Sequence, residues 1–276
     1  MWVIFCYPIV DSVVERSRRG VPVWINQPLV GTIDYRKCFR AHIMTKPLCV
    51  VVGVGPGNGA SFTRRFLRDG YRVAVLARDS TYLESLSTSL SECYPFPCDV
   101  RNTEELNGTL TSLTERLGPT SVLIYNAGAG EWRSPEETTV EGFESSWRTN
   151  ALGLLVSSQA VLQDMKAQGH GNIVVIGATA SKRGGATSTA FASAKAAQRS
   201  LAQSLARRLG PAGIHVSHLV IDGIIDLPRT RAKRPDTPDD FYLQPDDIAD
   251  TVAQITQQPR SAWTFEVDLR PYKEKW

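Results

Sequence analysis

The chain has 276 residues, of which 42% are hydrophobic and 21% are charged, a composition that suits one globular domain and excludes a disordered or fibrous chain. No apolar stretch reaches the roughly 18 residues that crossing a bilayer requires, so a membrane-spanning protein is not expected. The five cysteines are odd in number and contain no Cys-x-x-Cys pair, which argues against a disulfide framework or a zinc site. A reducing compartment, and hence a cytoplasmic protein, is expected.

The net charge of +3 comes from residues 1–43, which hold six basic and three acidic residues. Residues 44–276 carry 25 of each sign and show no basic stripe with interleaved aromatic residues. We therefore expect neither a nucleic-acid partner nor a membrane partner for this part of the chain. A small-molecule substrate is the expected partner.

Residues 1–43 differ from the rest in their scattered Pro and Gly and their weak periodicity. No positive run precedes the apolar start, so the segment is a poor secretory signal. We expect an extension of uncertain structure, either unstructured or artefactual, with targeting or membrane contact as the alternative. Residues 44–276 are expected to form the working domain, and translation could begin at Met44.

From Leu48 onward, short β-branched runs alternate with stretches of helical period. Runs that are apolar on both faces are typical of a parallel sheet covered by helices. Seven strands joined by helices predict a single α/β domain with a doubly wound, seven-stranded parallel sheet, the Rossmann fold. The predicted strands are Leu48–Val52, Arg72–Leu76, Tyr94–Asp99, Ser121–Tyr125, Asn172–Ile176, Ile214–Val220 and Thr264–Asp268.

Helix starts are predicted where a capping residue precedes an acidic one. Asn102 with Glu105 and Thr81 with Glu84 have capping-box spacing. Ser134 with Pro135 and Glu137 predicts a third start.

A glycine-rich turn follows the first predicted strand. Gly53, Gly57 and Gly59 lie between this strand and a predicted helix, and Asn58 lies among them. Glycines at such a turn let the backbone approach a pyrophosphate, whose charge the N-terminus of the next helix stabilises. The position predicts dinucleotide binding.

The end of the second predicted strand bears on which nucleotide binds. NAD binders place an acidic residue on the ribose there, whereas a 2′-phosphate calls for an arginine. The sequence has Arg78 followed by Asp79, which favours NADP(H) over NAD(H) because a guanidinium pairs with phosphate through two hydrogen bonds. The alternative is a solvent-facing Arg78 paired with Asp79.

Further motifs follow in order. They are Asp99-Val100, the segment Asn126-Ala127-Gly128 after Tyr125, Asn150 in a predicted helix, and Lys195 in a later one. With the glycine turn, they make residues 48–270 resemble the short-chain dehydrogenase/reductase (SDR) family. The resemblance implies that Asp99 and Val100 hold adenine, that Asn126, Ala127 and Gly128 line the cofactor groove, that Asn150 supports a catalytic water, and that Lys195 holds the nicotinamide ribose.

The sequence departs from the family at the catalytic tyrosine. The family has a tyrosine four residues before the lysine and a serine about thirteen residues before the tyrosine, but this chain has Phe191 and Ala178 there. A general acid or base contributes roughly 10²- to 10⁴-fold in rate, so the usual mechanism cannot run unaltered. Three replacements remain open: Thr179 or Ser181 at the serine position, Lys195 itself as proton donor, or an acid such as Asp222.

Two functions follow from these motifs. The first is an NADP(H)-dependent oxidoreductase acting on a carbonyl, alcohol or enone through a non-standard proton donor, with Asn150 and Lys195 as catalytic residues. The second is a non-catalytic NADP(H) sensor or assembly subunit. The resemblance also implies a homo-dimer or homo-tetramer, because family members assemble through small residues on the helices corresponding to those of Asn150 and Lys195.

Overall fold

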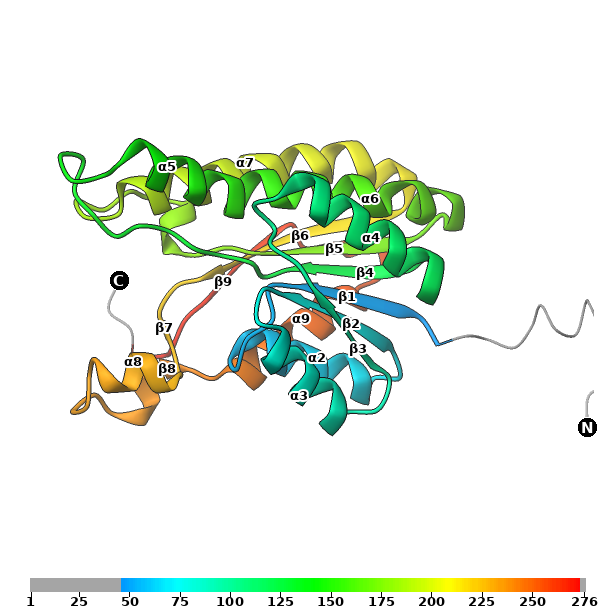
Figure 1. The fold of residues 1–276 in the computed structure, drawn as a ribbon, viewed down its shortest axis with the longest axis horizontal. Coiled ribbons are helices and arrows are strands. Elements are labelled where there is room, and N and C mark those ends of the chain that lie inside the picture. Colours follow the sequence, from blue (N-terminus) through cyan, green and yellow to red (C-terminus); the bar gives the residue numbers. More distant parts are fainter. Residues whose placement is uncertain (1–45, 274–276) are drawn as a thin grey trace, which may run out of the picture. The chain divides into compact units, whose positions relative to one another are not determined.

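Seven parallel strands form the centre of the structure (Figure 1). The computed structural model describes residues 46–273, and the predicted extension, residues 1–43, lies outside them. The sheet order is β3-β2-β1-β4-β5-β6-β9, which confirms the predicted doubly wound sheet. Its strands are β1 (Leu48–Val52), β2 (Arg72–Ala77), β3 (Cys93–Pro97), β4 (Thr120–Tyr125), β5 (Gly171–Ile176), β6 (Ile214–Ile221) and β9 (Glu266–Leu269).

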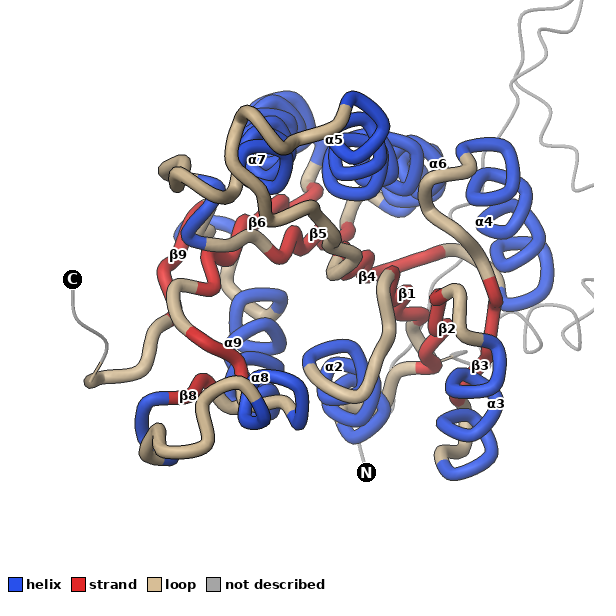
Figure 2. Tube along the Cα trace, turned by 60° about the vertical axis from the view of Figure 1, so that its left-hand side comes forward, coloured by secondary structure: helices blue, strands red, loops and turns tan. Residues whose placement is uncertain are grey.

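Helices cover both faces of the sheet (Figures 1 and 2). Strand residues alternate between two cores: Val50 packs with the helices of one face, and Val51 packs with those of the other. One face carries α4 (Thr103–Leu117), α5 (Val140–Trp147), α6 (Gly153–Gln168) and α7 (Thr189–Leu209), and the other carries α2 (Asn58–Arg68), α3 (Ser80–Ser89) and α9 (Pro245–Thr256).

The strand order reverses between β1 and β4, which pair directly with each other. The chain leaves β1 toward one edge of the sheet and β4 toward the other. In such sheets, ligands bind outside the carboxyl ends of the strands at this switch point. Both the glycine turn after β1 and the Asn126 segment after β4 lie there.

Two of the three predicted helix starts need correction. Asn102 caps α4 as predicted, accepting from Glu105 N at 3.2 Å. The cap of α3 is Asp79, not Thr81, because its carboxylate accepts from Tyr82 N at 3.0 Å. Ser134 begins no helix: it makes a turn closed by Glu137, and α5 starts later, after a Thr139 cap.

The segment after β6 folds back over the carboxyl edge of the sheet (Figure 1). It contains β7 (Ile224–Ile225), α8 (Pro228–Ala232) and β8 (Tyr242–Leu243), and β7 pairs with β8 in a small parallel sheet that the sequence analysis did not predict. Arg231 on α8 forms ion pairs with Asp226 at 2.7 Å and with Asp239 at 2.5 Å. Its guanidinium also stacks on Tyr242, 4.0 Å from the ring centroid. We call residues 224–243 the flap.

Across residues 46–273, no helix combines the length and apolar character of a membrane span, and no cluster of three or more potential metal ligands occurs. Cys49, Cys93 and Cys98 are buried free thiols. Oligomerisation and a cytoplasmic location stay predictions.

Candidate active site

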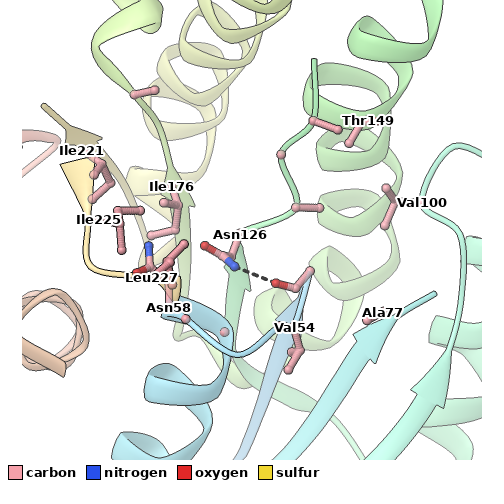
Figure 3. A pocket seen from close by; sticks show the side chains of 18 of the residues that line it. Val54, Asn58, Ala77, Val100, Asn126, Thr149, Ile176, Ile221, Ile225 and Leu227 are labelled. Carbon is pink, nitrogen blue, oxygen red and sulfur yellow. Dashed lines mark hydrogen bonds between the residues drawn. The ribbon is translucent and has the colours of Figure 1, made fainter. Parts of the chain in front are cut away.

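A cavity of about 1120 Å³ runs along the carboxyl ends of the strands. Figure 3 shows side chains from the glycine turn, from the ends of β2, β4 and β5, and from the flap converging on it. All but one of the residues predicted to bind cofactor or to catalyse line it: Gly53, Gly57, Asn58, Gly59, Arg78, Asp99, Val100, Asn126, Ala127, Gly128 and Lys195. Asn150 lies in the wall behind Gly128.

The glycine turn is shaped by contacts that leave no room for side chains. Gly53 has a φ of +92°, and a Cβ there would overlap the main chain of Ala127. A Cβ on Gly59 would lie 2.6 Å from Val54 Cα. Asn126 Nδ2 donates to Gly53 O at 2.6 Å, which ties the turn to the end of β4 (Figure 3).

Helix α2 begins at this turn, with Gly57 as an N-cap that offers no side-chain acceptor. Ala60 N donates to Gly55 O at 3.0 Å, so the N–H groups of Asn58 and Gly59 are the ones available to an anion, and the helix dipole favours negative charge there. The turn fits a pyrophosphate.

Arg78 and Asp79 separate at the end of β2. Asp79 caps α3, whereas Arg78 is exposed and lines the cavity. No ion pair within the described part of the chain involves Arg78, so the alternative of an Arg78–Asp79 pair does not match the structure. The guanidinium is available to a phosphate.

Asp99 is held by its neighbour Arg101. The guanidinium donates from Nε at 3.0 Å and from Nη2 at 2.6 Å to Asp99 Oδ2. The Arg101 guanidinium thereby holds the pKa of the Asp99 carboxyl below its usual value. Asp99, Val100 and Arg101 all line the end of the cavity that also contains Arg78.

Lys195 is the buried cation of the site. The residue is 4% exposed, and its ammonium donates to Ile176 O at 2.9 Å and to Gln198 Oε1 at 3.0 Å. Burial lowers the pKa of the Lys195 ammonium to about 7. A lysine at this pKa can both hold and release a proton near neutral pH.

Asn150 sits in a π-helical turn, Arg148–Leu152, between α5 and α6. Its Nδ2 donates to Ala129 O at 2.6 Å and to Ser146 O at 2.8 Å. Its main-chain carbonyl accepts from Gln198 Nε2 at 3.0 Å. Its Oδ1 is buried without a partner, beside Gly128, where Lys195 Nζ also lies.

Phe191 stands one helical turn before Lys195 on α7. Its ring packs against Trp132, with centroids 4.8 Å apart and an interplanar angle of 34°. The Lys195 Nζ atom lies 6.0 Å from the Phe191 centroid. Both rings line the cavity, so aromatic surface occupies the wall where the family resemblance implies a phenol.

Two of the candidate replacement groups are engaged elsewhere. Thr179 Oγ1 donates to Asp222 Oδ1 at 2.5 Å, and Arg270 pairs with the other carboxylate oxygen at 2.8 Å. Ser181 Oγ accepts from Ala178 N at 3.1 Å. Lys195 is therefore the candidate that the geometry favours.

Sequence reasoning missed the site residue Gln198. It expected residues 227–241 to be a flap over the substrate, but it did not foresee the contact that Leu227 makes with the glycine turn. Gln198 is fully buried between Lys195 and Asn150, and its only sequence signal is a polar residue on the inner face of a helix. Leu227 of the flap reaches into the cavity and contacts Gly57 (Figure 3). That contact joins segments 170 residues apart, and no local pattern indicates it.

Comparison with known proteins gives consistent matches. The profile of the short chain dehydrogenase family matches residues 47–238. An uncharacterized oxidoreductase of Staphylococcus aureus strain USA300 is 27% identical over 231 residues, covering 83% of this chain and 99% of the relative. A short-chain dehydrogenase from Rhodopseudomonas palustris is 34% identical, with a TM-score of 0.71, and the match covers 82% of this chain and 99% of that chain.

A second solved structure contains a nucleotide. It is an alcohol dehydrogenase from the archaeon Thermococcus sibiricus, complexed with 5-hydroxy-NADP. It is 26% identical with a TM-score of 0.75, and the match covers 83% of this chain and 98% of that chain. These similarities extend over most of residues 46–273 and nearly the full length of each relative.

Proposed function

The chain belongs to the short-chain dehydrogenase family, and from this premise we propose that it is an NADP(H)-dependent oxidoreductase with Lys195 as its proton donor. Its substrate is a small carbonyl or alcohol compound, or an enone. The observation that carries the proposal is the buried Lys195 ammonium on the cavity wall beside Gly128.

Three features support a dinucleotide in the cavity. The crowded glycines Gly53 and Gly59 bring main chain, not side chain, to the surface at the switch point. The uncapped start of α2 supplies N–H groups for the pyrophosphate. Arg78 supplies an unpaired guanidinium for the 2′-phosphate. When bound, the dinucleotide supplies or accepts the hydride.

Proton transfer then falls to Lys195. In the reducing direction, the carbonyl carbon gains the hydride and the C=O electron pair moves to oxygen. Lys195 Nζ gives its proton to that oxygen and becomes a neutral amine. Its two main acceptors, Ile176 O and Gln198 Oε1, are uncharged, so they accommodate the amine as well as the ammonium.

The cavity wall indicates the kind of substrate. Phe191, Trp132, Ile176 and Ile224 line its inner end, and Lys195 is the titratable group among them. The volume of about 1120 Å³ exceeds the roughly 300–1,000 Å³ of typical small-ligand pockets. A dinucleotide and a small apolar carbonyl compound can therefore occupy it together.

Two measurements test the proposal. Calorimetry should show NADPH binding to the purified protein, and NADPH oxidation should occur with at least one member of a panel of aldehydes, ketones, quinones and enones. Lys195→Met should abolish this turnover, whereas Lys166→Met, at an exposed position on α6, should not. NADPH binding without turnover on any class would instead indicate the non-catalytic sensor, and no binding of either coenzyme would refute both functions.

Coenzyme preference has its own test. Arg78→Ala should weaken NADPH binding about 10- to 100-fold, because it removes charge-assisted hydrogen bonds of about 1.5–3 kcal/mol. NADH binding should be unchanged. Arg207→Ala, at an exposed position on α7, serves as the matched control. Equal loss of both coenzymes in Arg78→Ala would contradict the assignment of Arg78 to the 2′-phosphate.

A further inference from the structure

Gln198 and Lys195 are the two polar side chains that α7 buries, and the other buried residues of this helix are Ala and Leu. Gln198 is 0% exposed and lies three residues after Lys195 on α7, so the two side chains share one face of the helix. A buried amide is costly unless both its ends are hydrogen-bonded. Both ends of the Gln198 amide are satisfied here.

The two ends join groups on different elements. Gln198 Oε1 accepts from Lys195 Nζ at 3.0 Å, and Gln198 Nε2 donates to Asn150 O at 3.0 Å. The amide thus connects the lysine of α7 to the π-helical turn before α6. The family resemblance implies that Asn150 supports a catalytic water; here the Gln198 amide reaches the main-chain carbonyl of Asn150.

The contact with Gln198 Oε1 fixes the direction of the Lys195 ammonium. An ammonium has three N–H donors, and two of them meet Gln198 Oε1 and Ile176 O. Nζ lies beside Gly128 of the cavity wall, where a Cβ would be 3.4 Å away, which leaves the third donor for a group in the cavity. Without Gln198, only the bond to Ile176 would hold the amine.

The charged groups near Lys195 pair with one another and not with the Lys195 ammonium. From β6, His218 interacts with Lys195, but burial lowers the pKa of this imidazole to about 4, so it is neutral at pH 7. His218 Nδ1 contacts Glu266 on β9 at 3.1 Å. Arg199 on α7 pairs with Glu266 at 2.6 Å and holds its pKa at about 2.

We infer that Gln198 is a positioning residue for proton transfer, since its amide aims the Lys195 ammonium at the cavity and ties it to Asn150. This inference rests on the proposed function. An amide keeps its own protons, so unlike a water it does not pass one along the connection. Lys195 therefore regains its proton from the cavity side.

The experiment compares three variants. Gln198→Glu places a carboxylate on the lysine, which stabilises the ammonium; Gln198→Met keeps the volume without hydrogen bonds; and Gln203→Glu adds the same charge elsewhere on α7 as a control. In the protein without coenzyme, the pH dependence of Lys195 acetylation by acetic anhydride is followed by mass spectrometry. Only the neutral amine reacts, so the midpoint of the acetylation curve against pH reports the pKa of Lys195 directly.

The expected result is a midpoint raised by about one pH unit or more in Gln198→Glu and unchanged in Gln203→Glu. In NADPH oxidation, the fall in rate with rising pH should move upward by the same amount. Gln198→Met should lower kcat about 10-fold with little change in NADPH affinity. A lower kcat with unchanged NADPH affinity indicates a positioning role, because a loss of fold would lower both kcat and NADPH affinity.

Coincident midpoints in the unaltered protein and Gln198→Glu would overturn the inference. If Gln198→Glu fails to fold, an unchanged kcat in folded Gln198→Met would overturn it as well. The labelling result does not require coenzyme. Absence of NADPH binding with a shifted midpoint would therefore overturn the proposed function and leave the positioning of Lys195 supported.

Discussion

Restoring a phenol at Phe191 tests the assignment of proton transfer most directly. The Phe191 centroid lies 6.0 Å from Lys195 Nζ. The ammonium lies over the face of this ring, so a para hydroxyl would extend along the cavity wall and not straight at the amine. Phe191→Tyr therefore adds a second acid to the cavity wall that also contains Lys195.

The expected change in turnover number depends on how the new phenol and Lys195 share the proton transfer. A positioned general acid is worth about 10²- to 10⁴-fold, but here it supplements Lys195 instead of replacing a missing group. The stacked Trp132, at 4.8 Å, also fixes the ring in its present orientation. We expect the turnover number to rise by about 10-fold, at the low end of the range. The change in stability should be small, because Phe191 is only partly buried.

The assay is NADPH oxidation with the best substrate of the panel, measured from pH 6 to 10 alongside NADPH affinity. In the unaltered protein the rate should fall as pH rises through the pKa of Lys195, about 7, because the ammonium is the active form. Phe191→Tyr should keep activity above that pH. Phe143→Tyr, at an exposed position on α5, is the control. A Phe191→Tyr variant with normal NADPH binding and the same profile as the unaltered protein would refute a cavity-facing proton donor at this end of α7.

Three further predictions concern the frame of the site. Gly59→Ala should cost about 1–3 kcal/mol of unfolding free energy and abolish NADPH binding by calorimetry, whereas Gly55→Ala, where a Cβ meets nothing within 4 Å, should change neither. Glu266 has its pKa lowered from 4.5 to about 2 by the neighbouring guanidinium. Its stabilisation, up to about 3 kcal/mol, is present above pH 4.5 and lost as pH falls toward 2; thermal unfolding of Glu266→Gln should show a smaller acid-induced drop. Arg231→Ala should release NADPH several-fold faster in stopped-flow measurements, because it removes two ion pairs that hold the flap, and an unchanged rate would contradict that role.

The fold was predictable because its signals are local. Strands such as β1 are apolar on both faces, and the run Leu48–Val52 has the same bounds in sequence and structure. Helix α7 likewise follows its periodicity over Thr189–Leu209. The glycine turn could be placed because only glycine fits where main chain meets main chain, as at Gly53 and Gly59.

The rest depends on contacts between distant segments. The β7–β8 pair has two residues in each strand, too few for a periodicity. The partner of Asp99 proved to be Arg101, and Arg270 from the C-terminal segment neutralises Asp222. Sequence spacing can propose that Asp222 is an acid, but only the fold shows that its carboxylate is already paired.

The loss of the phenol and the retention of the lysine are physically linked. Beside a phenol, a lysine acts through its charge, so its own proton stays in place. Burial lowers the pKa of the Lys195 amine to about 7, where it can itself exchange a proton. In the proposed mechanism, the acid therefore lies one helical turn further along α7 than Phe191. In this mechanism a substrate oxygen approaches Nζ beside Gly128, and the Phe191 and Trp132 rings that line the same cavity favour flat, apolar carbonyl compounds over polar ones.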